Sequence, residues 1–172
     1  MTLRKKCLLI LTVTFLFACN AEKKFKRSIK EDDIQVPVGF GKKEGTLLVV
    51  MTGKKGFDRW YKKNFLENYK GKYILLDQGE DHDPQYKDVK TYPYVLGQDM
   101  IMNIRQEHVQ YGNGLGSTEN THSLTERFFI MDRQTKVIYS TKKKIAVSNK
   151  GMRAYVQALE EIRAKNAVKN SN

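Results

Sequence analysis

Runs of apolar residues separated by polar turns divide most of the chain into short strands and amphipathic helices. The run 47–51 is continuous and rich in branched residues, which is typical of a strand buried on both faces. A second run of this kind lies at 73–76, and between the two, apolar residues recur at helical spacing over 57–69. The pattern predicts a right-handed unit of two parallel strands joined by a helix that Gly71 ends.

The last third of the chain predicts a hairpin followed by a helix. The apolar runs 128–131 and 137–139 flank a turn of hairpin length, so two antiparallel strands are expected. Ser148 or Asn149 is placed to cap a closing helix. The apolar positions of that helix form one stripe: Met152, Tyr155, Val156, Leu159 and Ile162.

The middle of the chain has a weaker pattern. We expect a short strand at 94–96, a weak helix over 99–107 and a glycine-containing loop over 111–122. Together, the elements predict one α/β domain over 46–165, with a central mixed sheet of about four to five strands flanked by helices. Residues 166–172 are expected to form a polar tail.

The first 18 residues have the order of a secretory signal. A cationic start precedes an apolar run that is too short to cross a bilayer as a helix. The run ends at Leu16-Phe17-Ala18-Cys19, which resembles the lipobox of bacterial lipoproteins. We therefore expect cleavage before Cys19 and attachment of diacylglycerol and an N-acyl chain to it. An ordinary secreted protein cleaved near Ala18 is the competing interpretation.

The segment 19–45 is polar and contains Pro37 and three glycines, which is typical of a flexible tether. Ile34, Val36 and Val38 alternate with polar neighbours, so a short strand at the edge of the domain is the alternative. The lipid would hold the domain on a membrane of the cell envelope. Asparagine, and not aspartate, follows the lipidated cysteine, which favours the outer membrane over the inner one.

Cysteine content limits the chemistry of the mature domain. The chain has two cysteines, Cys7 in the signal and Cys19 at the lipid attachment point. The mature domain is therefore expected to have no free thiol, which excludes a disulfide, thiol exchange and a thiolate nucleophile.

The formal net charge of +12 is spread over short lysine runs. The chain has no RNA-binding motif and no zinc-finger spacing, so no nucleic-acid partner is expected. Basic residues close to an anionic lipid surface each contribute up to about 1 kcal/mol of attraction, which fits the predicted membrane location.

Two segments of the predicted domain carry motifs. Residues 92–99 read YPYVLGQD and are followed by Tyr111-Gly112, and residues 128–139 read FFIMDRQTKVIY. They resemble the "fPvlsD…yG" and "tflIDrdGkivy" passages of the peroxiredoxin and TlpA-like branch of the thioredoxin family. The resemblance covers most of residues 46–164 and implies a thioredoxin-like fold.

The chain departs from this family at both redox hallmarks. Where the family has its reactive cysteine, after the first strand, residues 52–58 contain none. Where the family has a cis-proline before the hairpin strand, residues 124–127 read LTER, so a trans peptide bond is expected. Neither thiol oxidoreductase nor peroxidase activity is expected.

In a thioredoxin-like fold, the segments 52–58, 77–83 and 121–126 would meet at one edge of the sheet, where ligands of α/β proteins often bind. The candidate binding residues on this edge are Lys54, Lys55, Asp58, Asp81, His82, Asp83, His122, Thr125 and Glu126. His82 and His122, with acidic neighbours, have the side chains that a divalent metal prefers. They lack the close spacing of a zinc motif, so no metal or other cofactor is expected.

The leading hypothesis is a membrane-anchored envelope lipoprotein whose redox-inactive domain binds an envelope protein partner. One alternative is a metal-dependent or other non-thiol enzyme that uses the edge around His82 and His122. Another is a structural lipoprotein without a discrete site. No residue is assigned a catalytic role.

Overall fold

The computed structural model describes residues 21–32, 34–42, 45–110, 116–142, 144–146 and 148–169, without the side chains of 103, 105–110 and 116–121. The expected signal peptide and Cys19 lie outside this part of the chain. The elements are β1 (Leu47–Val50), α2 (Lys55–Asn68), β2 (Tyr73–Leu76), the 3-10 turns η1 (Glu80–His82) and η2 (Pro84–Tyr86), β3 (Tyr94–Gln110), β4 (Gly116–Asp132), β5 (Ile138–Ser140), β6 (Ile145–Ala146) and α3 (Asn149–Lys169). Residues 21–28 form a further helical segment.

The six strands form one mixed sheet in the order β2-β1-β3-β4-β5, and β6 pairs with β4 beside this path. β1 is parallel to both β2 and β3, whereas β4 is antiparallel to β3, β5 and β6. The predicted α/β class, the parallel unit and the antiparallel hairpin before the closing helix are confirmed. The sheet has one or two strands more than predicted.

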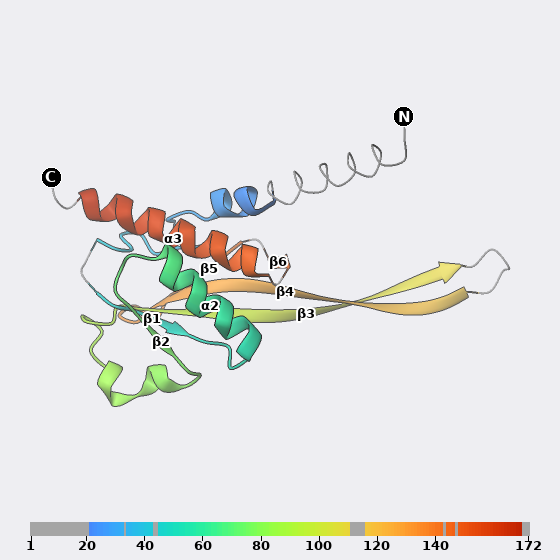
Figure 1. Cartoon of the computed structure of the whole chain (residues 1–172), viewed down its shortest axis with the longest axis horizontal. Helices are drawn as coiled ribbons and strands as arrows, with labels where there is room; N and C mark the ends of the chain where they lie inside the picture. The colour runs from blue at the N-terminus through green and yellow to red at the C-terminus, as the bar shows by residue number, and fades with distance from the viewer. Residues whose placement is uncertain are drawn as a thin grey trace.

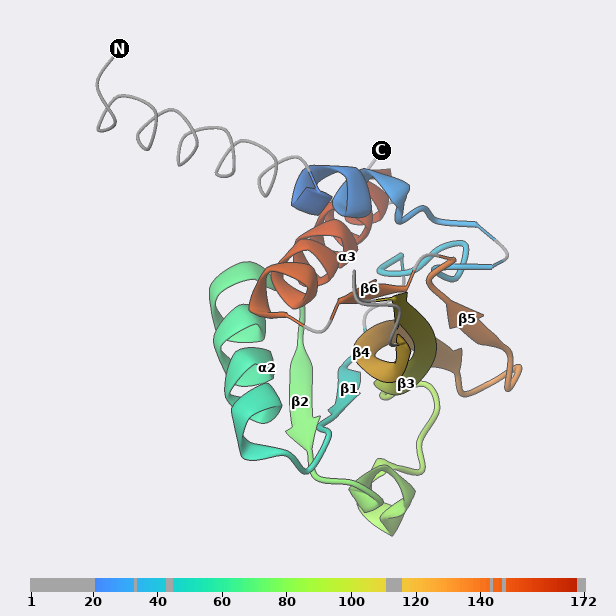
Figure 2. The ribbon, with the colours of Figure 1, turned by 90° about the vertical axis from the view of Figure 1, so that its right-hand side faces the viewer.

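Alternate residues of the strands give the sheet two apolar faces. Leu47, Val49 and Leu96 belong to a large core that includes buried residues of α2 and α3, which lie side by side (Figure 2). Leu48 and Val95 belong to a smaller core on the opposite face. The segment between β2 and β3, which carries η1 and η2, packs against this second core. We call the two surfaces the helix face and the loop face.

β3 and β4 continue far beyond the rest of the sheet as a two-stranded arm (Figure 1). β3 pairs with β4 over its whole length of 17 residues. The expected helix over 99–107 is therefore wrong. Residues 116–122 of the expected loop belong to β4, and 111–115 lie outside the described residues. The apolar residues Met100, Met102 and Ile104 recur with the period of a strand, which opposes a helix.

The N-terminal segment packs into the domain and is not a free tether. Phe25, Val36 and Phe40 are buried in the core on the helix face. The Glu22 carboxylate accepts hydrogen bonds of 2.8 to 2.9 Å from the Arg153 guanidinium of α3. The tether expected over 19–45 is therefore wrong for the described residues, because a few widely spaced apolar side chains hold the segment in place without a regular pattern.

The alternative of an edge strand and the expected polar tail are also corrected. The Ile34 carbonyl accepts a hydrogen bond of 2.7 Å from Ser140 of β5, but only isolated bridges surround Val36, so the segment forms no regular strand. α3 continues to Lys169, and its buried Asn166 side chain donates a hydrogen bond of 2.9 Å to the Phe40 carbonyl. Residues 166–169 of the predicted tail are therefore part of the domain, and 170–172 lie outside the described residues.

The two predicted helix boundary signals have different outcomes. Ser148 caps α3, because its Oγ accepts a hydrogen bond of 3.1 Å from the Gly151 amide. Gly71 does not end α2 with a left-handed residue, since α2 ends at Asn68 and Gly71 has no positive φ. A Cβ at Gly71 would collide with Arg163 and Tyr69, so this glycine allows a close approach to α3.

We predict that Val36→Ala lowers the free energy of unfolding by about 2 kcal/mol, because the side chain is fully buried in the core. The matched variant Val38→Ala, at a side chain that is 63% exposed, should change it by less than about 0.5 kcal/mol. Urea denaturation of both variants measures the difference. Equal midpoints would show that the segment does not support the fold.

Candidate functional site

A cavity of about 400 Å³ opens where β1 ends, mainly on the loop face of the sheet. We call it the edge cavity. Its lining consists of Val50, Met51, Thr52, Lys54, Gln78, Asp81, Val95, Gly97, Gln98, Asp99, Met100, Phe129 and Met131. Lys54 comes from the loop after β1 and Asp81 from the turn after β2. The structure thus brings two of the predicted edge residues to one cavity at the carboxyl ends of parallel strands.

The walls of the edge cavity are apolar and adaptable. Met51, Met100 and Met131 line it, and methionine side chains adjust to partners of different shape. A Cβ at Gly97 would collide with the Phe129 ring, so the missing side chain makes room for that ring across β3. The Lys54 ammonium nitrogen lies 3.9 Å from the Met100 sulfur. A charged rim therefore borders an apolar wall.

Asp58 shapes the loop between β1 and α2. Its carboxylate accepts hydrogen bonds from the Thr52 amide at 2.8 Å and the Thr52 hydroxyl at 2.9 Å. The Gln78 side-chain amide donates a hydrogen bond of 3.0 Å to the Thr52 carbonyl, which connects this loop to the one after β2. Asp58 therefore positions the cavity wall and is not among the residues that line the cavity. Lys55 is the exposed first residue of α2.

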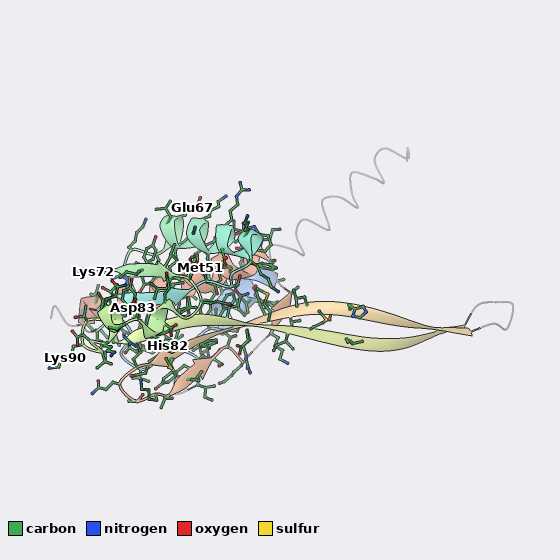
Figure 3. The ribbon with its side chains drawn as sticks, turned by 90° about the horizontal axis from the view of Figure 1, so that it is seen from below. Met51, Glu67, Lys72, His82, Asp83 and Lys90 are labelled. Atoms are coloured by element: carbon green, nitrogen blue, oxygen red, sulfur yellow. The ribbon has the colours of Figure 1, made fainter. Side chains whose placement is uncertain are left out.

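The two candidate metal ligands lie on different parts of the molecule. His82 is exposed in η1, with its Nδ1 3.8 Å from the Asp81 carboxylate, and Asp83 caps η2; both lie on the body (Figure 3). His122 lies on β4 in the arm, opposite Ile104. Within the described ranges, no group of three or more His, Cys, Asp or Glu residues is arranged to hold a metal ion.

Glu126 is fully buried beneath the start of α3 and does not line the edge cavity. It accepts a hydrogen bond from the Gln98 side-chain amide and one of 3.4 Å from the Ser148 backbone amide. The neighbouring Thr125 hydroxyl donates a hydrogen bond of 3.3 Å to the Ile101 carbonyl of β3, across the arm. The expectation that Glu126 faces a partner is therefore wrong, because position 126 lies on the helix face together with the buried Phe128.

Burial raises the pKa of Glu126 to about 8, from an ordinary value of 4.5. Its two hydrogen-bond donors oppose this shift without cancelling it. The Gln98 Oε1 atom has no hydrogen-bond partner among the described residues, so it is available to a protonated Glu126. A neutral carboxylic acid suits this site.

Two phenol groups share the interior with Glu126. The hydroxyls of Tyr61 and Tyr155 are buried without a hydrogen-bond partner in the described part of the chain. Burial, and secondly the nearby Glu126 carboxylate, raise the pKa of Tyr61. The Tyr155 ring stacks on Phe128 with 4.3 Å between centroids. Both phenols therefore remain neutral.

The residue pattern did not single out Gln98, Asp99 or the three methionines of the edge cavity. For the buried Glu126, the sequence did contain a signal. Leu124, Glu126, Phe128 and Ile130 alternate with other residues, which places an acid among apolar residues on one face of a strand. The prediction for residues 124–127 is confirmed, since all described peptide bonds are trans.

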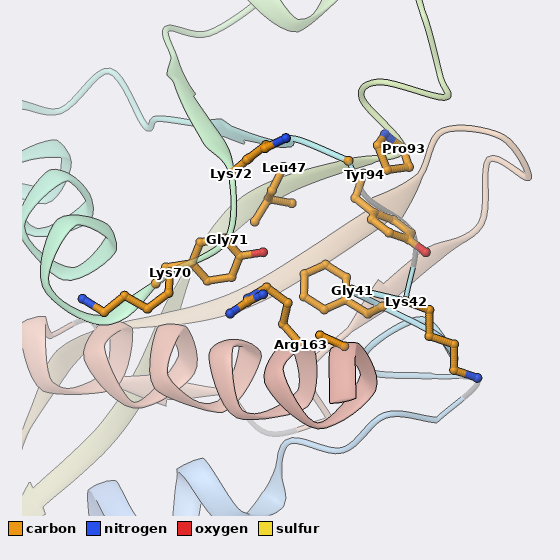
Figure 4. Close-up of a pocket in the computed structure, with 13 residues that line it drawn as sticks. Gly41, Lys42, Leu47, Lys70, Gly71, Lys72, Pro93, Tyr94 and Arg163 are labelled. Atoms are coloured by element: carbon orange, nitrogen blue, oxygen red, sulfur yellow. The ribbon is translucent and has the colours of Figure 1, made fainter. Parts of the chain in front are cut away.

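A second cavity, of about 420 Å³, lies near the amino ends of the parallel strands, between β1 and α3 (Figure 4). The Arg163 guanidinium at its wall is bound by the Glu160 carboxylate at 2.6 and 2.8 Å and lies 6.0 Å from the Tyr69 ring centre. The Lys42 and Lys70 side chains extend away from it (Figure 4). Its arginine therefore has a structural role in joining α3 to the end of α2.

No protein-family model matches the chain, and a search of curated proteins finds no match. One similar solved structure is a Helicobacter pylori protein named as a homologue of neuraminyllactose-binding hemagglutinin. It is 12% identical, with a TM-score of 0.32, and the similarity covers 82% of this chain and 90% of that one. This distant likeness assigns neither a family nor a function.

We predict that Glu126→Gln removes a pH dependence of stability. Between pH 4.5 and about 8, folded Glu126 holds a proton that the unfolded chain releases. The contribution of Glu126 to the wild-type free energy of unfolding is therefore largest below pH 4.5 and falls by about 1.4 kcal/mol per pH unit up to about pH 8. From pH 5 to pH 8, the variant should gain about 2 to 4 kcal/mol relative to wild type.

Urea denaturation at several pH values measures this difference. Glu67→Gln, on the exposed surface of α2, is the control and should keep the wild-type slope. A wild-type slope in Glu126→Gln would contradict the assignment of a protonated buried acid.

Proposed function

We propose that the protein is a membrane-anchored envelope lipoprotein whose domain binds a protein partner at the edge cavity. The observation that carries the proposal is the cavity itself, with three methionine side chains in its walls and Lys54 and Asp81 at its border. Apolar, flexible walls with charged borders favour a protein side chain over a small polar metabolite.

The composition of the domain favours binding over thiol chemistry. Neither cysteine lies within residues 20–172, so the cavity has no thiolate at the position where a thioredoxin-like enzyme carries its nucleophile. At that position, Thr52 instead makes hydrogen bonds to Asp58. The domain is thioredoxin-like but redox-inactive. Its order of elements and the two motifs support this part of the proposal.

The lipid on Cys19 would hold the domain close to the membrane. The helical segment that follows is packed from its first turn, since Glu22 binds Arg153 and Phe25 is buried. Only about two residues therefore separate the lipid from the packed domain. No helix in the described ranges is both long and apolar enough to cross a bilayer. The outer membrane of the envelope is the proposed location.

The alternative of a metal-dependent enzyme loses its main support. His82 is on η1 and His122 is on the arm, so the two side chains do not share a site. Another non-thiol enzyme and a structural lipoprotein without a discrete site remain as competitors, and the crosslinking experiment below separates the structural lipoprotein from a binding module.

We predict that photoreactive residues introduced at Lys54 and Asp81 crosslink to the same envelope protein in intact cells, because both positions border the edge cavity. A residue introduced at Lys63, which is exposed on α2, is the matched control and should give no such adduct. Mass spectrometry identifies the crosslinked protein. Adducts at all three positions, or at none, would favour the structural lipoprotein.

A further inference from the structure

One edge of β3 is open along the arm. β1 pairs with β3 only over Tyr94–Leu96 and ends at Val50. Beyond Leu96, β3 has β4 on one side and, among the described residues, no strand on the other. Such an edge is able to pair with a further strand.

The backbone groups at this open edge belong to the even-numbered residues. The Pro93 carbonyl accepts a hydrogen bond of 2.9 Å from the Arg133 amide, so the odd-numbered positions of β3 direct their backbone groups toward β4. By alternation, Gln98, Met100, Met102 and Ile104 direct their N–H and C=O groups outward. Four successive hydrogen-bonding positions therefore lie along the edge.

The side chains of the same positions extend the helix face of the sheet. Under α2 and α3 this face is buried, with Leu96 and Phe128 fully covered. On the arm it continues with Met102, Ile104 and Leu124, which are 67%, 62% and 36% exposed. A two-stranded ribbon is at best marginally stable in water, and three or more strands with an apolar face are needed for stability. Within the described part of the chain, the arm therefore has neither a third strand nor a cover over its apolar face.

We propose that β3 pairs antiparallel with β3 of a second copy of this chain, about a two-fold axis at Met102. The two arms then form one four-stranded sheet. In this register, Met102 lies opposite Met102 of the second copy, and Met100 lies opposite Ile104. Even positions face even positions, so the outward backbone groups of both copies meet each other. Apolar residues from both copies adjoin on one face.

The charges of β3 favour this register over the neighbouring one. Within one copy, Asp99 is also bound by Arg127 of β4 at 3.1 Å. With the axis at Met102, Asp99 lies opposite position 105 of the second copy, which is an arginine. Moving the axis by one residue, to position 103, places Asp99 opposite position 107, which is a glutamate. Opposite charges across an antiparallel pair are favourable and like charges are unfavourable. The edge is therefore self-complementary in hydrogen bonding, apolar contact and charge, as a two-fold interface requires.

Single cysteines in the full-length lipoprotein test the interface. Residues paired by backbone hydrogen bonds across antiparallel strands have Cα atoms about 5.5 Å apart, within disulfide range. Met102→Cys should therefore form a disulfide-linked dimer under mild oxidation. Leu124→Cys lies on the same exposed face but one strand away from the axis, and should yield at least about tenfold less dimer. Wild type controls for any unlipidated Cys19.

A double variant tests the register. Met100→Cys with Ile104→Cys should crosslink between copies, whereas each single substitution should not, since only the pair brings two cysteines opposite each other. Circular dichroism confirms that each variant is folded. Equal dimer yields from Met102→Cys and Leu124→Cys, absence of dimer, or crosslinking of Met102→Cys to a different protein would each overturn the proposal. Gln98 and Met100 line the edge cavity, whereas Met102 and Ile104 do not. The Met102→Cys dimer therefore tests the arm, and the adducts at Lys54 and Asp81 test the edge cavity.

Discussion

The pairing of β3 with β4 is the interaction on which the rest of the structure depends. In the body, Tyr94–Leu96 of β3 pair with β1 on one side and with β4 on the other. They thereby connect the parallel unit to the hairpin strands that precede the closing helix. At the level of Gly97 and Phe129 it forms the floor of the edge cavity. Further out it is the arm itself. Because side chains alternate strictly along both strands, a shift of one residue would move every apolar side chain to the wrong face.

Glu126 shows how closely the arm is joined to the body. It lies on β4 where the arm leaves the sheet, opposite Met100 of β3 and opposite Ile145 of β6. A Cβ at Gly151 would collide with Ile145 and press on the Glu126 carboxyl group, so α3 packs closely over this point. Among the described residues, no cation lowers the pKa of Glu126, so the neutral acid, bonded to Gln98, is the form that the packing accepts.

Local patterns predicted the elements whose apolar residues are regular. The strands at 47–50 and 73–76, the first helix and the capped closing helix follow from period, branching and the Ser148 cap. The packed N-terminal segment did not, because Val36 and Phe40 are buried in a core shared with distant elements. Phe40, for example, contacts the ring of Tyr94 in β3 and accepts a hydrogen bond from Asn166 of α3. For the site, loop positions after β1 and β2 predicted Lys54 and Asp81. The wall of the edge cavity that contains Asp99 and Met100 was not predicted. It belongs to β3, whose sequence over 99–107 resembles a weak helix.

The pairing of β3 with β4 connects the proposed partner binding at the edge cavity with the proposed dimer. The proposed lipid on Cys19 would be followed almost at once by packed residues, so it would leave the domain little freedom to move away from the membrane. β3 has 17 residues, which span about 55 Å when extended, so the arm reaches distances that a tether would otherwise supply. A solitary ribbon of that length is a weak structure in water, whereas two arms paired along β3 form a four-stranded sheet. Dimerisation would thus stiffen the arm and place two edge cavities on one membrane-bound assembly, so that a partner with two binding segments gains avidity without any new contact.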